Sequence, residues 1–178
     1  MMLVCGTAVV RSEIMTTAAS RPAWQMWLFH TTAPRATVLI RIAVGGIFLS
    51  EGIQKFLFPG ELGTGRFAKI ALLPQPAVWA NADGIFEIIC GVLIILGLVT
   101  RLATIPMIVD MVGAQVLTKF TMAAHQGAWV YLHESRVEHG QLLGLVFLLI
   151  VGAGGWSLDA ALASRMGMRR NENSPLRS

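Results

Sequence analysis

The chain has 178 residues, of which 54% are hydrophobic and only 13% are charged. Its mean hydropathy of +0.64 indicates an integral membrane protein and excludes an ordinary soluble domain. The formal net charge of +4 would suggest nucleic-acid binding in a soluble protein, but basic residues beside membrane spans record orientation instead. The sequence contains no phosphate-binding loop, dinucleotide fingerprint or nucleic-acid motif, so we expect no nucleic-acid partner.

Residues 1–35 are interpreted as an N-terminal extension that precedes the membrane domain. The first apolar run, residues 1–10, lacks a preceding basic region and a convincing cleavage site, so it is a poor signal peptide. Trp24, Trp27 and Phe29 follow at near-helical spacing. This spacing predicts a short aromatic helix that lies at the level of the lipid head groups.

Four apolar segments follow, each long enough to cross roughly 30 Å of hydrocarbon as a helix. They cover residues 36–58, 78–99, 102–120 and 138–155. We therefore predict an all-α, four-helix transmembrane bundle over residues 36–160, followed by a basic tail at 161–178.

The connections between these spans differ in character. Residues 61–77 contain several glycines and prolines, and 66–73 are expected to form two turns of interfacial helix with Phe67 and Ile70 facing lipid. A tight turn at Thr100–Arg101 makes the second and third spans antiparallel neighbours. Residues 121–137 are predicted to form a polar loop.

The distribution of lysine and arginine predicts the orientation of the bundle. On one side lie nine basic residues, against five on the other (Lys55, Arg66, Lys69, Lys119 and Arg136), which together account for all 14. Because cytoplasmic loops carry the excess of basic residues, both termini are expected to be cytoplasmic, in a bacterial inner membrane.

With this orientation, the ionisable and amide side chains within the spans gather in the outer half of the bundle. Charged groups inside a membrane face the bundle interior and pair, since each costs about 2.5–3.5 kcal/mol at the bilayer centre. These side chains are Glu51, Gln54 and Lys55 on the first span, Asp83 and Glu87 on the second, and Asp110 and Lys119 on the third.

Two interpretations of this cluster remain open. In one, the groups only join helices, with Lys55 paired to Glu87, and Glu51 paired to Lys119 or to the backbone. In the other, they line an outward-facing pocket for a polar ligand, a proton or a quinone head group. Acidic groups outnumber basic ones there, so we expect at least one carboxyl to be protonated, with Asp110 the best candidate for passing a proton on.

Cysteine and histidine suggest no redox or metal centre. The two cysteines are far apart in the sequence and form no Cys-x-x-Cys pair, so Cys90 is interpreted as a packing residue. His125, His133 and His139 match no zinc-binding pattern, and only His139 lies near a span. We therefore predict neither a metal site nor a haem.

Several motifs occur in an order that resembles the DoxX family. They are Arg41-x-x-x-Gly45-x-x-Phe48-x-x-x-Gly52-x-x-Lys55, then Glu87-x-x-x-Gly91 and Leu96-Gly97-x-x-Thr100-Arg101, then a glycine-rich segment that ends in Ser157-Leu158-Asp159. The resemblance covers about residues 38–160. It implies a small four-helix protein of the bacterial inner membrane, similar to the membrane subunit of thiosulfate:quinone oxidoreductase. The paired redox cysteines of some members are absent here.

The sequence thus supports two functional hypotheses. In the first, the protein is a subunit of a membrane redox system, with a quinone as its possible cofactor. Glu87 and Asp110 would handle protons, and Glu51, Gln54, Lys55, Asp83 and Lys119 would bind a quinone head group or a small sulfur oxyanion. The chain has no electron carrier of its own, so it would need other redox subunits. In the second hypothesis, it is a non-catalytic membrane scaffold or part of a small-solute passage. Under either hypothesis, further copies of the chain are candidate partners in a homo-oligomer.

Overall fold

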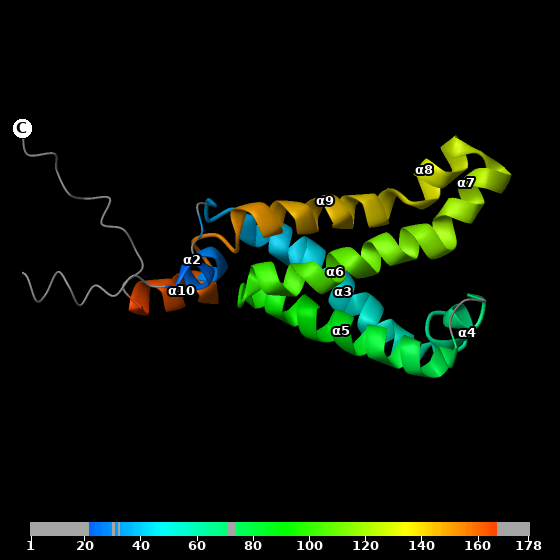
Figure 1. Cartoon of the computed structure of the whole chain (residues 1–178), viewed down its shortest axis with the longest axis horizontal. Helices are drawn as coiled ribbons and strands as arrows, with labels where there is room; N and C mark the ends of the chain where they lie inside the picture. Colours follow the sequence, from blue (N-terminus) through cyan, green and yellow to red (C-terminus); the bar gives the residue numbers. More distant parts are fainter. Residues whose placement is uncertain (1–21, 30, 32, 71–73, 167–178) are drawn as a thin grey trace, which may run out of the picture.

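The computed structural model describes residues 22–29, 31, 33–70 and 74–166. Every secondary-structure element in these ranges is helical, which confirms the all-α prediction (Figure 1). The apolar run at 1–10, Cys5 and the end of the basic tail lie outside the described residues. The boundaries proposed for the N-terminal extension, the membrane domain and the tail stay predictions.

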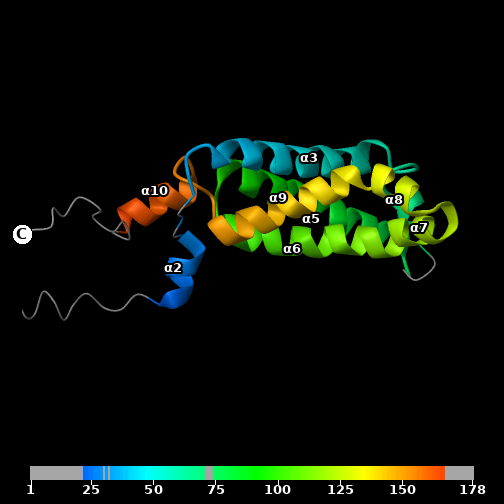
Figure 2. The same ribbon diagram turned by 90° about the horizontal axis from the view of Figure 1, so that it is seen from above.

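Four long helices run side by side, as Figure 2 shows from above. They are α3 (Thr37–Leu57), α5 (Pro76–Leu96), α6 (Thr100–Ala114) and α9 (Arg136–Val151). A π-helical segment, η1 (Gln115–Lys119), continues α6 directly into a shorter helix. The shorter helices are α2 (Ala23–Phe29), α4 (Thr64–Phe67), α7 (Phe120–Gln126), α8 (Ala128–Glu134) and α10 (Leu158–Arg165).

Within the described residues, three helical stretches are long and apolar enough to cross a membrane: Thr37–Leu57, Pro76–Leu96 and Thr100–Leu117. Helix α9 has 16 residues. At helical rise it reaches about 24 Å, less than the roughly 30 Å of a typical hydrocarbon core. The predicted fourth span therefore stays a prediction.

Three expectations for the connections are corrected. Residues 121–137, predicted to be a polar loop, form most of α7 and all of α8. The turn between α5 and α6 lies at 97–99 rather than at Thr100–Arg101, because Gly97 (φ 68°) ends α5 in the left-handed conformation. Of the interfacial helix predicted at 66–73, residues 71–73 lie outside the described residues, and in the described part the helix is α4, which begins at Thr64, ends at Phe67 and packs on α5.

Close backbone contact joins α3 to α5. A Cβ atom on Gly45 would lie 2.7 Å from the carbonyl oxygen of Gly91, and one on Gly52 would lie 2.8 Å from that of Gly84. Small residues allow such approach in membrane bundles.

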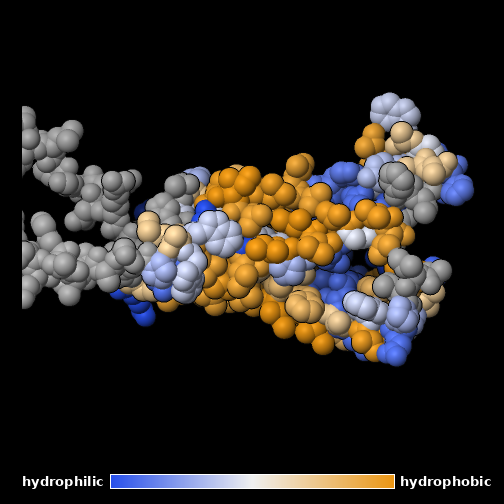
Figure 3. Space-filling model, viewed as in Figure 1, coloured by the Kyte–Doolittle hydropathy of each residue, from blue (hydrophilic) through white to orange (hydrophobic). Residues whose placement is uncertain are grey.

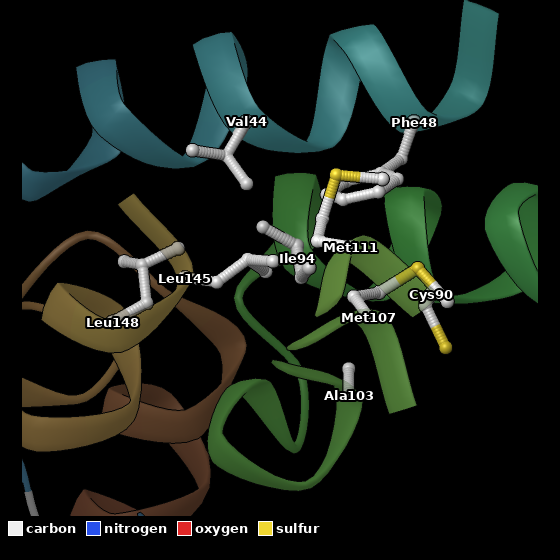
Figure 4. Packing of buried hydrophobic residues seen from close by; sticks show 9 residues of the cluster. All are labelled: Val44, Phe48, Cys90, Ile94, Ala103, Met107, Met111, Leu145 and Leu148. Carbon is white, nitrogen blue, oxygen red and sulfur yellow. The ribbon is translucent and has the colours of Figure 1, made fainter. Parts of the chain in front are cut away.

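The two helix pairs α3/α5 and α6/α9 lie close at one end and diverge toward the other (Figure 1). We call the end beside α2 and α10 the narrow end, and the end beside α4, α7 and α8 the wide end. A hydrophobic cluster joins the pairs between the two ends, with Phe48, Ile94, Met107 and Leu145 almost fully buried (Figure 4). Cys90 belongs to this cluster, as its interpretation as a packing residue predicted.

Buried ionic groups close the narrow end. Arg41 donates hydrogen bonds to the carbonyl oxygens of Ile95, Ala153 and Trp156 at 2.7–2.9 Å. Its guanidinium group is therefore held inside the protein, whereas a lysine or arginine near the end of a membrane helix often extends to the lipid–water interface. Asp159 accepts hydrogen bonds from the backbone N–H groups of Val99 (2.7 Å) and Thr100 (3.0 Å). Burial raises the pKa of Asp159, and these hydrogen bonds partly oppose the effect.

The contact between α3 and α5 yields a prediction with an adjacent control. Gly45→Ala should lower the free energy of unfolding by about 1–3 kcal/mol, because the new methyl group meets backbone that cannot rotate away. Gly46→Ala should be neutral or slightly stabilising, since no atom lies within 4 Å of its Cβ position. Denaturant unfolding in detergent measures both, and equal effects would contradict the proposed contact.

Candidate functional site

A cavity of about 600 Å³ lies between the diverging helices at the wide end. Figure 3 shows hydrophilic surface inside the hollow between α5 and α6, framed by hydrophobic surface. The lining side chains come from α3, α5, α6, η1, α9 and the segment around α4. They are Phe48, Glu51, Lys55, Arg66, Phe67, Ile70, Trp79, Ala82, Asp83, Phe86, Glu87, Pro106, Val109, Asp110, Met111, Gly113, Ala114, Leu117, Val137, Glu138 and Gln141.

Lys55 is the central charged group of this cavity. Its ammonium nitrogen lies 2.6 Å from Oε2 of Glu87 and also forms an ion pair with Asp83. Only 8% of the Lys55 side chain and 1% of the Glu87 side chain are exposed. Asp83 and Glu87 are four residues apart on α5, so both carboxyl groups face the same side of the helix and meet one ammonium group.

The close contact of α3 with α5 positions this ion pair. Gly52 lies one helical turn before Lys55, and Gly84 lies one turn before Glu87. Because these glycines allow the backbones to approach, the lysine reaches both carboxyl groups across the interface.

A third carboxyl group faces the pair from the other side of the cavity. Oxygen atoms of Asp83, Glu87 and Asp110 all lie within 4.8 Å of one another. Three carboxylates are suitable ligands for a hard divalent cation. However, Lys55 donates to two of them and already supplies a positive charge at this place, so the arrangement does not favour a metal over the ammonium group.

The remaining walls of the cavity are mainly apolar and aromatic. The Lys55 nitrogen lies 6.0 Å from the centre of the Phe67 ring, within the range of a cation–π interaction. Phe67 and Ile70 also line the cavity, a position that the expectation of two lipid-facing side chains did not include. Trp79 and Phe86 contribute two further aromatic rings from α5.

The structure brings together five of the seven residues proposed as a site: Glu51, Lys55, Asp83, Glu87 and Asp110 line the cavity. Gln54 lies outside the lining, and its amide donates to the Ser50 hydroxyl at 2.8 Å. Lys119 also lies outside, but its nitrogen is 3.2 Å from Glu138, which is a lining residue. The pairing of Glu51 with Lys119, considered from the sequence, is therefore replaced by a pair between Lys119 and Glu138.

The histidine-bearing segment at 121–137 forms most of α7, all of α8 and the start of α9. His139 packs edge-on against Tyr131, with ring centres 5.6 Å apart. The Tyr131 hydroxyl donates to the side-chain oxygen of Gln115 at 2.8 Å, which ties α8 to η1. The sequence offered one sign of the missed lining residues, because Trp79 and Phe86 flank Asp83 at helical spacing on α5.

The fold and the cavity define a helical membrane protein with a lysine-centred polar site between its helices. A model of the family described as DoxX matches residues 36–120, which include α3, α5, α6 and all but three of the lining residues. The chain is 45% identical over 155 residues to the uncharacterized membrane protein Rv3486 of Mycobacterium tuberculosis, covering 84% of this chain and 94% of that protein. This protein belongs to the DoxX family.

A second relative is more distant. The "Putative oxidoreductase CatD" of Bacillus subtilis is 27% identical over 123 residues, which cover 69% of this chain and 84% of that protein. No solved structure matches the chain.

The ion pair yields a charge-balance prediction. Lys55→Met should lower the free energy of unfolding by about 3–5 kcal/mol, because it leaves Glu87 buried without its positive partner. Adding Asp83→Asn and Glu87→Gln to Lys55→Met should recover much of that loss, since the unpaired charges are then removed. Denaturant unfolding in detergent measures each variant, with Lys69→Met at an exposed position as the control. No recovery in the triple variant would contradict the assigned pairing.

Proposed function

We propose that this DoxX protein is a subunit of a membrane redox system and that its cavity binds a quinone head group. The observation that carries the proposal is the combination of an apolar and aromatic cavity with the charged groups Lys55, Glu87 and Asp110 in its lining. Aromatic rings can pack against a planar quinone ring. Lys55 can donate a hydrogen bond to a quinone oxygen, and the carboxyl groups can exchange the protons that accompany quinone reduction.

Charge balance favours a quinone over a small sulfur oxyanion at this position. The lining contains five carboxyl groups, from Glu51, Asp83, Glu87, Asp110 and Glu138, but only two basic side chains, from Lys55 and Arg66. Lys55 is already paired with two of these carboxyl groups. An entering anion would meet an excess of negative charge in a medium of low dielectric constant, whereas a neutral quinone would not.

The similarity to CatD supports a redox role, since that relative is described as a putative oxidoreductase. A quinone carries electrons only if a donor or acceptor can reach it, so the proposal includes a partner protein that exchanges electrons with the bound quinone. Any sulfur oxyanion used by the system would then react on that partner.

A non-catalytic scaffold is the second candidate function. The buried ion pair of Lys55 with Asp83 and Glu87 favours it, because such pairs can fix helix register without taking part in chemistry. The scaffold needs no ligand in the cavity, so ligand binding separates the two candidates.

Filling the cavity tests the quinone proposal. Gly113 is a lining residue on α6, and no atom lies within 4 Å of its Cβ position. Gly113→Trp should therefore occupy the cavity without straining the helix and weaken quinone binding about tenfold or more, which is at least about 1.4 kcal/mol. Equilibrium binding of a benzoquinone to the purified protein in detergent measures the effect.

Val112→Trp is the matched control, since Val112 is the neighbouring residue on α6, is exposed and does not line the cavity. It should leave quinone affinity unchanged. If the wild-type protein binds no quinone, or if both variants bind as well as wild type, the proposed function is wrong and the scaffold is favoured.

We also propose that α9 completes a four-helix transmembrane bundle in the bacterial inner membrane, with both termini cytoplasmic. The excess of basic residues on the side of the termini supports this orientation. The wide end and its cavity would then lie in the outer half of the membrane.

Single-cysteine labelling tests this orientation, in a variant that lacks the native Cys5 and Cys90. Arg66→Cys should react with a membrane-impermeant maleimide added to the periplasmic side, because it lies beside the wide end. Arg165→Cys on α10 should react only after the membrane is opened. Reaction of Arg165→Cys in intact cells that exclude the reagent would overturn the orientation.

A further inference from the structure

We propose that the cavity opens sideways into the lipid phase between α5 and α6. Its ligand would then be a lipid-dissolved quinone that enters head group first and leaves its isoprenoid tail between these helices. The inference rests on the proposed function for the identity of the ligand, but the opening itself is a property of the protein alone.

The carboxyl groups of Asp83 and Asp110 lie behind apolar side chains of α5 and α6. On α5, Asp83 lies four residues after Trp79 and three before Phe86, so one face of the helix carries a carboxyl group between two aromatic rings. On α6, Asp110 follows Val109 directly. The two carboxyl groups approach each other behind an apolar rim that both helices provide.

The apolar side chains that form this rim are about half exposed or more. Trp79, Phe86 and Val109 all line the cavity, yet 49%, 55% and 67% of their respective surfaces are exposed. Side chains that both line a cavity and face outward form its entrance. In a membrane helix, exposed apolar surface at this depth faces acyl chains rather than water.

Helices α5 and α6 diverge from each other along their length. The turn at 97–99 holds α5 and α6 together at the narrow end, and the helices separate toward the wide end (Figure 1). Figure 3 shows the result on this face of the molecule, where hydrophilic surface is visible inside a hydrophobic frame. Among the described residues of the membrane helices, this arrangement places polar groups within reach of a ligand that never leaves the bilayer.

The α3/α5 contact offers no comparable opening. Gly45 meets Gly91 and Gly52 meets Gly84 in close backbone contact, which leaves no room for a ligand between those helices. Phe48, Met111 and Gln141 bound the cavity on the side toward the hydrophobic cluster, and all three are buried. A head group that enters between α5 and α6 therefore stops against Lys55 and the three carboxyl groups.

Spin-label accessibility in reconstituted vesicles tests the opening without any ligand. The probe is a nitroxide on an Ala82→Cys variant, in a background that carries Cys5→Ser and Cys90→Ala, because Ala82 is half-buried and lines the cavity. Oxygen concentrates in lipid, whereas a water-soluble nickel chelate stays in the aqueous phase. Val112→Cys is the lipid-facing reference, and Glu61→Cys, on the exposed connection at the wide end, is the aqueous reference.

For a lateral opening, the ratio of oxygen to nickel accessibility at Ala82→Cys should match that at Val112→Cys. A ratio that matches Glu61→Cys, with strong nickel relaxation, would overturn the proposal, because the cavity would then open to water. A label that neither reagent reaches would overturn it as well, since the cavity would then be closed. All three results are independent of whether a quinone binds.

Quinone binding then separates this inference from the proposed function. Ile105→Trp, one turn before Val109 on the exposed face of α6 and outside the cavity lining, should obstruct the path of the tail and weaken binding of a prenylated benzoquinone about tenfold, while affinity for the tail-less parent ring changes little. Equal loss for both compounds would contradict the tail path but not the head-group site. Binding of neither compound to the wild-type protein would contradict the proposed function and leave the accessibility result to decide the opening.

Discussion

The ion pair of Lys55 with Asp83 and Glu87 depends on how closely α3 and α5 approach. Gly45 and Gly91, with Gly52 and Gly84, remove the side chains that would hold the two backbones apart. An ammonium group on one helix can then satisfy two carboxyl groups on the other in a region where unpaired charge is costly. The cavity exists because α6 and α9 do not follow this pair but diverge from it at the wide end.

The two ends of the molecule use charge in different ways. At the narrow end, Arg41 and Asp159 bind backbone groups of the α5–α6 turn and of the glycine-rich segment after α9, which closes the bundle. At the wide end, the charged groups surround a cavity instead of a peptide segment. The hydrophobic cluster around Phe48 and Met107 separates these regions. The proposed ligand site therefore lies at the wide end, and the hydrophobic cluster separates it from the narrow end.

Much of this arrangement could be predicted from the sequence, because apolar length and helical spacing are local properties. They predicted the long helices and the pair of Lys55 with Glu87, and motif order predicted the DoxX family. The partners of Arg41 and the positions of Phe67 and Ile70 could not be predicted in this way. Each depends on a chain segment distant in sequence or on a connection that folds back over the bundle. Apolar character alone does not distinguish a lipid-facing residue from the wall of a cavity.

The proposed function depends on a quinone head group that occupies the cavity beside Lys55. Photolabelling with an azido-quinone, followed by mass spectrometry of the labelled peptides, tests it most directly. Label should attach to cavity-lining residues of α5 and α6, including the stretches around Phe86 and Val109, and excess unlabelled quinone should prevent the reaction. Label confined to lipid-facing residues outside the cavity, or label that excess quinone does not reduce, would contradict it.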